Sequence, residues 1–130
     1  MSLYRVIVPV TDIEQAARFY SEVLGEPGRR VSGGRHYFGA DKAGGAIVAC
    51  YSPKDDGDAR RYGVEWRPHP QQYLYFSVDD LEAARQRCIS AGARDITDID
   101  KMPWGETMFY AVDPFGNPIS FVLAGTEFIG

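Results

Sequence analysis

Two stretches of the chain alternate apolar and polar residues, and each runs directly into a helical pattern. The alternation over Leu3 to Val10 and over Tyr73 to Val78 predicts two β-strands, because successive side chains of a strand point to opposite faces. Apolar residues at helical spacing then predict an amphipathic helix after each strand. These positions are Ile13, Ala16, Ala17, Tyr20 and Leu24 in the first helix and Leu81, Ala84, Cys88 and Ala91 in the second.

Both ends of each predicted helix carry a local signal. A residue able to cap the first turn precedes a glutamate at the spacing of a capping box, and a glycine follows the last turn. The capping pairs are Thr11 with Glu14 and Asp79 with Glu82, and the glycines are Gly25 and Gly92. The helix boundaries are therefore predicted from local sequence alone.

The two halves of the chain repeat one order of elements. Val10-Thr-Asp-Ile-Glu-Gln-Ala-Ala-Arg18 aligns without a gap with Val78-Asp-Asp-Leu-Glu-Ala-Ala-Arg-Gln86. Short strand-like runs follow each helix: Arg30 to Ser32, Arg35 to Ala40 and Ala46 to Tyr51, then Ala93 to Ile99, Glu106 to Val112 and Pro118 to Leu123. The order β-α-β-β-β is thus predicted twice.

Residues 52–71 separate the two modules and differ from them in composition. Charged residues, glycine and proline dominate in Lys54 to Asp58 and Arg67 to Pro70, which is typical of an exposed connection. The prediction is a single domain over 1–130, with module one over 3–51, a linker over 52–71 that can carry a flap, and module two over 72–125.

Strand alternation also predicts which side chains face away from the helices. Leu74, Phe76 and Val78 form an apolar set for the helix, which leaves Tyr73 and Tyr75 on the open face. The open faces are aromatic and aliphatic with a few polar groups, as in a small-molecule pocket, although such residues also serve ordinary sheet packing. The candidate ligand-binding residues are Arg5, Tyr51, Tyr73, Tyr75, Trp104, Glu106, Met108, Tyr110 and Ser120.

Composition and charge narrow the classes of function. The 130 residues, 45% hydrophobic and 13% aromatic, suffice for one domain with a real core. A net charge of -4 with scattered arginines argues against nucleic-acid binding. No apolar stretch is long enough to cross a membrane, so we expect a cytoplasmic protein. We expect Cys50 and Cys88 to be reduced and buried.

The motifs resemble those of the vicinal oxygen chelate superfamily, which includes glyoxalase I, bleomycin-resistance proteins and extradiol dioxygenases. The first-module signature is matched from Val10 to Tyr20 with Leu24-Gly25, and the second-module ending by Trp104-Gly105 and Asp113-Pro-Phe-Gly-Asn-Pro118. The resemblance implies an α+β fold in which two βαβββ modules form a curved mixed sheet around a cleft, and it implies a homodimer. The Asp113 to Pro118 segment also suits a tight turn, so we interpret it as scaffold.

The residues that the resemblance places at the superfamily's metal positions are poor ligands. They are Arg5, Tyr73 and Ser120, with the fourth position near Ala49. Arginine only donates hydrogen bonds, and neutral hydroxyls are weak ligands beside imidazole or carboxylate. We therefore expect no metal and no other cofactor. His36 and His69 are interpreted as packing or surface residues.

Three functions remain open at this point. The first is a metal-independent protein that binds or sequesters a small aromatic or anionic compound. The second is a lyase, isomerase or dioxygenase-type enzyme, either metal-dependent or using Glu106 as a candidate catalytic base or Arg5. The third is a structural or regulatory module whose cleft is filled by its own side chains. Arg5 either binds an anion or pairs with Glu106, and both alternatives stay open.

Overall fold

The computed structural model describes residues 1–40, 44–58 and 66–130, which fall into two compact units, residues 1–68 and 69–130. Each unit has its own four-stranded sheet and its own long helix. Within the described ranges, no helix has the length and apolar character needed to cross a membrane.

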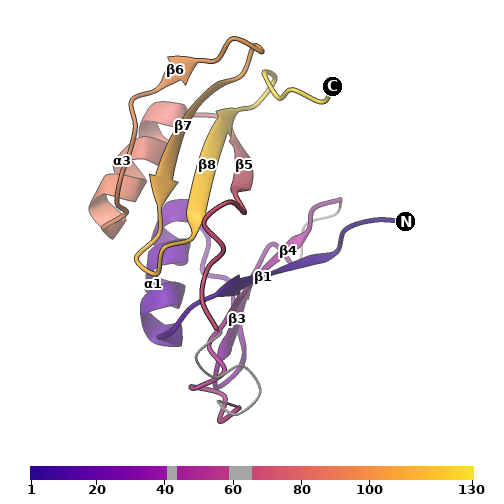
Figure 1. Ribbon diagram of the computed structural model, residues 1–130, viewed down its shortest axis with the longest axis vertical. Coiled ribbons are helices and arrows are strands. Elements are labelled where there is room, and N and C mark those ends of the chain that lie inside the picture. Colours follow the sequence, from indigo (N-terminus) through magenta and orange to yellow (C-terminus); the bar gives the residue numbers. More distant parts are fainter. Residues whose placement is uncertain (41–43, 59–65) are drawn as a thin grey trace. The chain divides into compact units, whose positions relative to one another are not determined.

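The first unit has the element order that the hydrophobic pattern predicts (Figure 1). Its elements are β1 (Arg5–Pro9), α1 (Ile13–Leu24), β2 (Arg29–Ser32), β3 (Arg35–Phe38) and β4 (Ile47–Tyr51). The sheet order is β1-β4-β3-β2, with β1 and β4 parallel and the other pairs antiparallel. Helix α1 packs on β3 and β4.

The second unit repeats this topology. Its elements are β5 (Leu74–Val78), α3 (Leu81–Ala91), β6 (Asp100–Lys101), β7 (Thr107–Val112) and β8 (Pro118–Leu123). The sheet order is β5-β8-β7-β6, again with a parallel pair, β5 and β8, beside antiparallel ones, and α3 packs on β7 and β8. The predicted α+β fold with two βαβββ modules is therefore confirmed.

The helix starts lie one residue later than the predicted capping boxes. Asp12 Oδ1 accepts a hydrogen bond from the Gln15 amide, and Asp80 Oδ1 accepts one from the Ala83 amide, both at 3.0 Å. Asp12 and Asp80, and not Thr11 and Asp79, are thus the N-caps, because each accepts a hydrogen bond from an amide that the first turn leaves free. The predicted glycine ends are confirmed: Gly25 and Gly92 adopt the left-handed conformation, with φ of 70° and 86°.

The prediction of a strand over Ala93 to Ile99 is wrong, because these residues do not form a regular strand. The segment contacts β7 through an isolated bridge between Arg94 and Val112, and the two-residue strand β6 follows only at Asp100. Asp95 has a positive φ of 51°, which interrupts an extended backbone. Thr97 still binds Tyr110, its amide donating to the Tyr110 carbonyl at 2.9 Å. The segment therefore follows β7 without forming a continuous ladder.

The register shows which side chains share a face of each sheet. In the second sheet Phe76, Phe121 and Phe109 lie side by side and stack, with ring centroids 5.4 and 5.0 Å apart. On the other face Tyr75 pairs with Ser120, and Ser120 with Tyr110.

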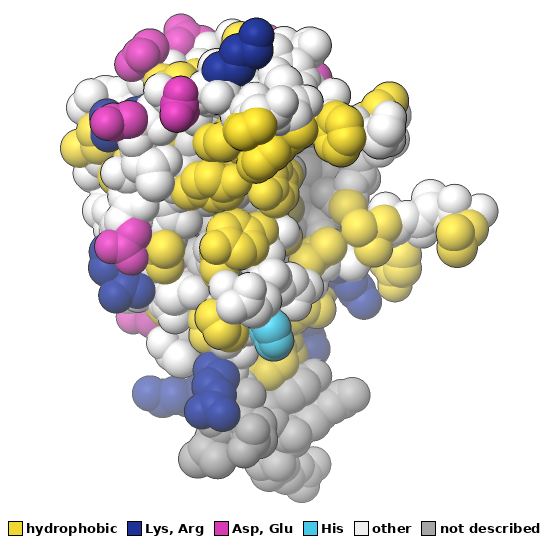
Figure 2. Space-filling view, turned by 45° about the horizontal axis from the view of Figure 1, so that its top comes forward, with side chains coloured by type: hydrophobic (Ala, Val, Ile, Leu, Met, Phe, Trp, Pro, Cys, Tyr) yellow, Lys and Arg dark blue, Asp and Glu magenta, His cyan; other side chains and the backbone are white. Residues whose placement is uncertain are grey.

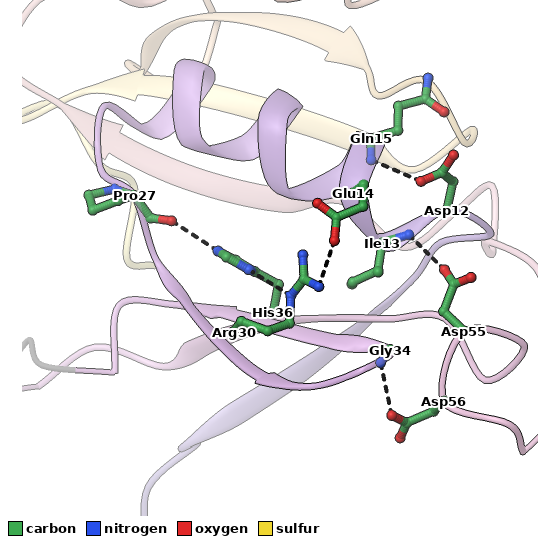
Figure 3. Close-up of polar contacts among 10 residues, drawn as sticks. All are labelled: Asp12, Ile13, Glu14, Gln15, Pro27, Arg30, Gly34, His36, Asp55 and Asp56. Atoms are coloured by element: carbon green, nitrogen blue, oxygen red, sulfur yellow. Dashed lines mark hydrogen bonds and ion pairs between the residues drawn. The ribbon is translucent and has the colours of Figure 1, made fainter.

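Asp55 and Asp56, which follow β4, are hydrogen-bonded to other parts of the first unit, although the sequence predicts an exposed linker there (Figure 3). Asp55 Oδ2 accepts from the Ile13 amide at 2.8 Å, and Asp56 Oδ1 accepts from the Gly34 amide at 2.8 Å. A side chain at position 34 would lie 2.2 Å from the Ser52 carbonyl oxygen, so glycine is required. Positions 59–65 of the predicted linker lie outside the described residues.

Candidate functional site

A pocket of about 660 Å³ opens on the side of the second sheet that faces away from α3. It is lined by Tyr75, Phe76, Ser77, Trp104, Glu106, Val122, Glu127 and Phe128. Three of the aromatic walls stay exposed: Tyr75 by 53%, Trp104 by 46% and Phe128 by 59%. Figure 2 shows how apolar side chains gather on the face in view, with most charged side chains toward its margins. Exposed aromatic surface of this kind is available to a ligand.

Glu106 is the polar centre of the pocket. It directly precedes β7, and its side chain is only 9% exposed. One carboxylate oxygen accepts a hydrogen bond from the Trp104 indole N–H at 2.7 Å, and the other accepts one from the Phe128 amide at 3.1 Å. Both oxygens accept from N–H groups, as those of an ionised carboxylate do. The same two bonds fix the positions of two of the pocket's aromatic walls.

Two residues after β8, Glu127 and Phe128, form one side of the pocket. The Thr126 hydroxyl accepts from the Thr107 amide at 3.2 Å and donates to the Leu123 carbonyl at 2.7 Å. Glu127 accepts from the Ser77 hydroxyl at 2.8 Å and from the Gly125 amide at 2.5 Å. Hydrogen bonds from its own amide, from Ser77 and from Gly125 lower the pKa of Glu127. Glu127 is therefore an anion at neutral pH.

Tyr73, directly before β5, and Tyr110 of β7 lie close to Tyr75, which lines the pocket. The Tyr73 ring stands edge-on to Tyr110 with centroids 5.9 Å apart, and it lies 6.5 Å from the Tyr75 ring. Burial and the neighbouring Tyr75 hydroxyl raise the pKa of Tyr110, so its phenol is neutral at physiological pH. Ser120, paired with Tyr75 and Tyr110, is fully buried, and its hydroxyl has no hydrogen-bond partner among the described residues.

The open face of the first sheet carries the other two predicted site residues, Arg5 and Tyr51. Arg5 donates to the Tyr37 hydroxyl at 3.3 Å, and its guanidinium lies 5.2 Å from the centre of the Tyr4 ring. Tyr51 is buried, its hydroxyl donates to Asp58 at 3.3 Å, and the Arg35 guanidinium lies 4.0 Å above its ring. Both side chains thus have partners within the first unit.

The residues at the superfamily's metal positions do not fit a divalent cation. The repeat places Ala49 and Ser120 at equivalent sites, since Ala49 pairs with Ile7 on β1 as Ser120 pairs with Tyr75 on β5. Methyl, guanidinium and neutral hydroxyl groups are not competitive metal ligands. Within residues 1–40, 44–58 and 66–130, no cluster of three His, Cys, Asp or Glu side chains could hold a metal.

Nucleophilic and histidine chemistry is also poorly supported by the described residues. Both cysteines are fully buried, and burial raises the pKa of the Cys88 thiol to about 11. His36 Nδ1 accepts from Arg30 Nε at 3.3 Å, so Nε2 carries the proton and donates to the Pro27 carbonyl at 2.9 Å (Figure 3). His69 Nδ1 accepts from the Gln71 amide at an exposed position. Both histidines have structural partners.

The pocket brings together three of the predicted site residues, Tyr75, Trp104 and Glu106. Tyr73, Met108, Tyr110 and Ser120 belong to the same unit but do not line the pocket, and Met108 is fully buried. Sequence reasoning missed Glu127 and Phe128, because it ended module two at residue 125. An aromatic residue next to a glutamate just after the last strand was the available signal.

Comparison with known proteins identifies the family. The family model of the Glyoxalase/Bleomycin resistance protein/Dioxygenase superfamily matches residues 2–121. The chain therefore belongs to this superfamily, and the resemblance predicted from the sequence is confirmed. A search of curated proteins found no match.

Solved structures support the fold. A glyoxalase-related enzyme from Fulvimarina pelagi is 20% identical, with a TM-score of 0.77 over 100% of this chain and 93% of the other. A superfamily enzyme from Burkholderia phytofirmans PsJN is 18% identical, with a TM-score of 0.74 over 95% of this chain and 98% of the other. A glyoxalase/bleomycin resistance protein from Albidiferax ferrireducens T118 is 20% identical, with a TM-score of 0.73 over 93% and 97%. Identities this low establish fold and not activity.

Proposed function

We propose that this protein binds a small organic compound with a flat apolar body, without a bound metal, in the pocket on the open face of the second sheet. The observation that carries the proposal is the pocket of about 660 Å³ with Tyr75, Trp104 and Phe128 as exposed walls. Its size is that of sites for drug-sized ligands, and flat aromatic walls favour ligands that can stack on them.

The aromatic part of the predicted ligand class has more support than the anionic part. Anion binding rests on Arg5, whose guanidinium already contacts Tyr4 and Tyr37. The residues that line the pocket include two glutamates and no basic side chain. An aromatic compound therefore agrees better with the pocket than an anion does.

An enzyme is the second candidate, and it depends on Glu106. A buried carboxylate next to aromatic walls is a candidate general base. Both Glu106 oxygens, however, already accept hydrogen bonds from Trp104 and Phe128, and no electrophilic partner lines the pocket. Binding without turnover agrees better with this arrangement.

The test is a titration of the full chain with 2-phenylethanol, followed by the NMR signal of the Trp104 indole N–H. We expect a saturable shift of this signal, loss of binding in Trp104→Ala, and unchanged binding in Ile89→Ala, which removes an apolar side chain of similar exposure from α3. Prolonged incubation should leave the compound intact. A titration that moves no pocket signal would refute the proposal, and consumption of the compound would favour the enzyme.

A further inference from the structure

The pocket contains two acids and no base. Glu106 and Glu127 are among its eight lining residues, and none of the eight is lysine, arginine or histidine. Within residues 69–130, all of which the structure describes, no ion pair joins either glutamate to a basic side chain. The ion pair that this unit does form, Arg85 with Asp98 at 3.5 Å, does not involve the pocket.

Glu106 is therefore buried without a neutralising charge from its own unit. Burying a carboxylate is unfavourable unless hydrogen bonds or an opposite charge compensate for the lost water. The Trp104 and Phe128 donors supply hydrogen bonds, but both are neutral N–H groups. A positively charged ligand group in the pocket would supply the missing charge, whereas an anion would add repulsion from Glu106 and Glu127.

The aromatic walls point to the same kind of ligand. Cations are attracted to the faces of aromatic rings, and tryptophan and tyrosine are the strongest partners. Trp104 and Tyr75 expose about half of their surface, and Phe128 exposes more. One pocket thus combines aromatic faces with two anionic side chains.

We propose that this pocket is selective for organic cations, in which a protonated amine or quaternary ammonium group is attached to a flat apolar body. The proposal deepens the proposed function and rests on it. The ammonium group lies near Glu106 and Glu127, and the apolar body lies against Trp104 and Tyr75.

Part of this site lies outside the residues that the family model matches. The family match ends at residue 121, whereas Val122, Glu127 and Phe128 line the pocket. One of the two acids and one of the exposed aromatic walls therefore come from the carboxyl-terminal segment of this chain. These two side chains therefore lie beyond the part of the chain that the family model matches.

Three probes of matched size and different charge test the proposal: 2-phenylethylamine, 2-phenylethanol and phenylacetate. Their affinities for the full chain are measured by calorimetry at neutral pH, with the Trp104 indole signal reporting the site. We expect the amine to bind at least about tenfold more tightly than the alcohol, and phenylacetate to bind most weakly. Raising the salt concentration should weaken the amine and leave the alcohol nearly unchanged.

Glu106→Gln should reduce the preference for the amine, and Glu82→Gln, at an exposed position in the first turn of α3, is the matched control. Because Glu106 also holds Phe128, Glu127→Gln provides a second variant that leaves the Glu106 bonds in place. Equal affinities of amine and alcohol, or tighter binding of phenylacetate, would overturn the cation selectivity and leave the proposed function standing. Failure of all three probes to shift the Trp104 signal would overturn both.

Discussion

The open faces of the two sheets have the same topology and different chemistry. On the first sheet the polar groups bind one another: Arg5 binds Tyr37, and Arg35 pairs with Asp56 and covers the ring of Tyr51. In the second unit Tyr75 of β5 and Trp104, which precedes β7, stay exposed, and Glu106 has no ion pair within its unit. The repeated backbone is thus compatible with two different sets of side chains, one with hydrogen bonds and an ion pair among its polar groups and one that leaves aromatic rings exposed.

The largest loss of stability in the second unit without a change to its pocket is expected when the side chain of Asp113 is removed. This buried carboxylate accepts from the Phe115 and Asn117 amides at 2.8 Å and from the Asn117 side chain at 2.7 Å, and so holds the turn before β8. Asp113→Ala leaves these donors unpaired, so we expect a loss of about 3 kcal/mol in the free energy of unfolding, measured by urea denaturation.

Asp98→Ala is the matched control for the Asp113 variant. Asp98 is fully exposed and pairs with Arg85 at 3.5 Å, so its removal should change stability by less than about 0.5 kcal/mol. A loss in Asp113→Ala no larger than in the control would contradict the interpretation of the Asp113 to Pro118 segment as scaffold.

Alternation along strands let the sequence predict the element order correctly, together with the sets of side chains that share a face. Whether Phe76 and Tyr75 share a face of the sheet is decided by the alternation of neighbouring residues, so a local pattern suffices. The capping aspartates were missed by one position because Thr11 and Asp12, like Asp79 and Asp80, can all act as caps.

The pocket was only partly predictable, because part of it is formed by contacts between residues that are distant in the sequence. Phe128 reaches it through a hydrogen bond to Glu106, and Glu127 through one to Ser77, partners that are far away in sequence. No periodicity records such contacts. The irregular segment after α3 was missed similarly, because one residue, Asp95, leaves the extended conformation within an otherwise strand-like composition.

In the first unit, we expect the stabilising effect of Asp56 to depend on pH. The neighbouring Ser32 hydroxyl, the Gly34 amide and Arg35 hold the pKa of Asp56 below its ordinary value of 3.8. Its stabilising effect is therefore complete above that value and is lost as the pH falls through the lower folded-state pKa. Asp56→Asn should lower the free energy of unfolding by about 1 kcal/mol at pH 7, and the difference from the wild type should shrink between about pH 4 and pH 2.

Thermal melts across this pH range check the prediction, and Asp58→Asn is the control from the same segment. Asp58 accepts a single 3.3 Å bond from Tyr51, so its variant should show a smaller loss. A difference for Asp56→Asn that stays constant down to pH 2 would argue against an ionised Asp56 as the stabilising species.

Removal of residues 127–130 should alter binding more than folding. The segment contributes Glu127 and the Phe128 wall, while its own hydrogen bonds are mostly at the surface. We expect the stability to fall by no more than about 1 kcal/mol and the affinity for 2-phenylethylamine to fall roughly fivefold. Full affinity in the truncated chain would show that residues 127–130 do not take part in binding.

The smallest difference between the two units is expected in the reactivity of their cysteines, Cys50 in the first unit and Cys88 in the second. Cys50 in β4 and Cys88 in α3 are fully buried, and burial raises the pKa of the Cys88 thiol to about 11. Because the thiolate is the reactive species, a thiol reagent at pH 8 should label the folded protein far more slowly than the urea-unfolded chain, in which both cysteines react. Mass spectrometry counts the labels. Selective labelling of Cys88 under native conditions would show that the second unit opens locally more often than the first, and would extend the difference between the two units from their surfaces to their cores.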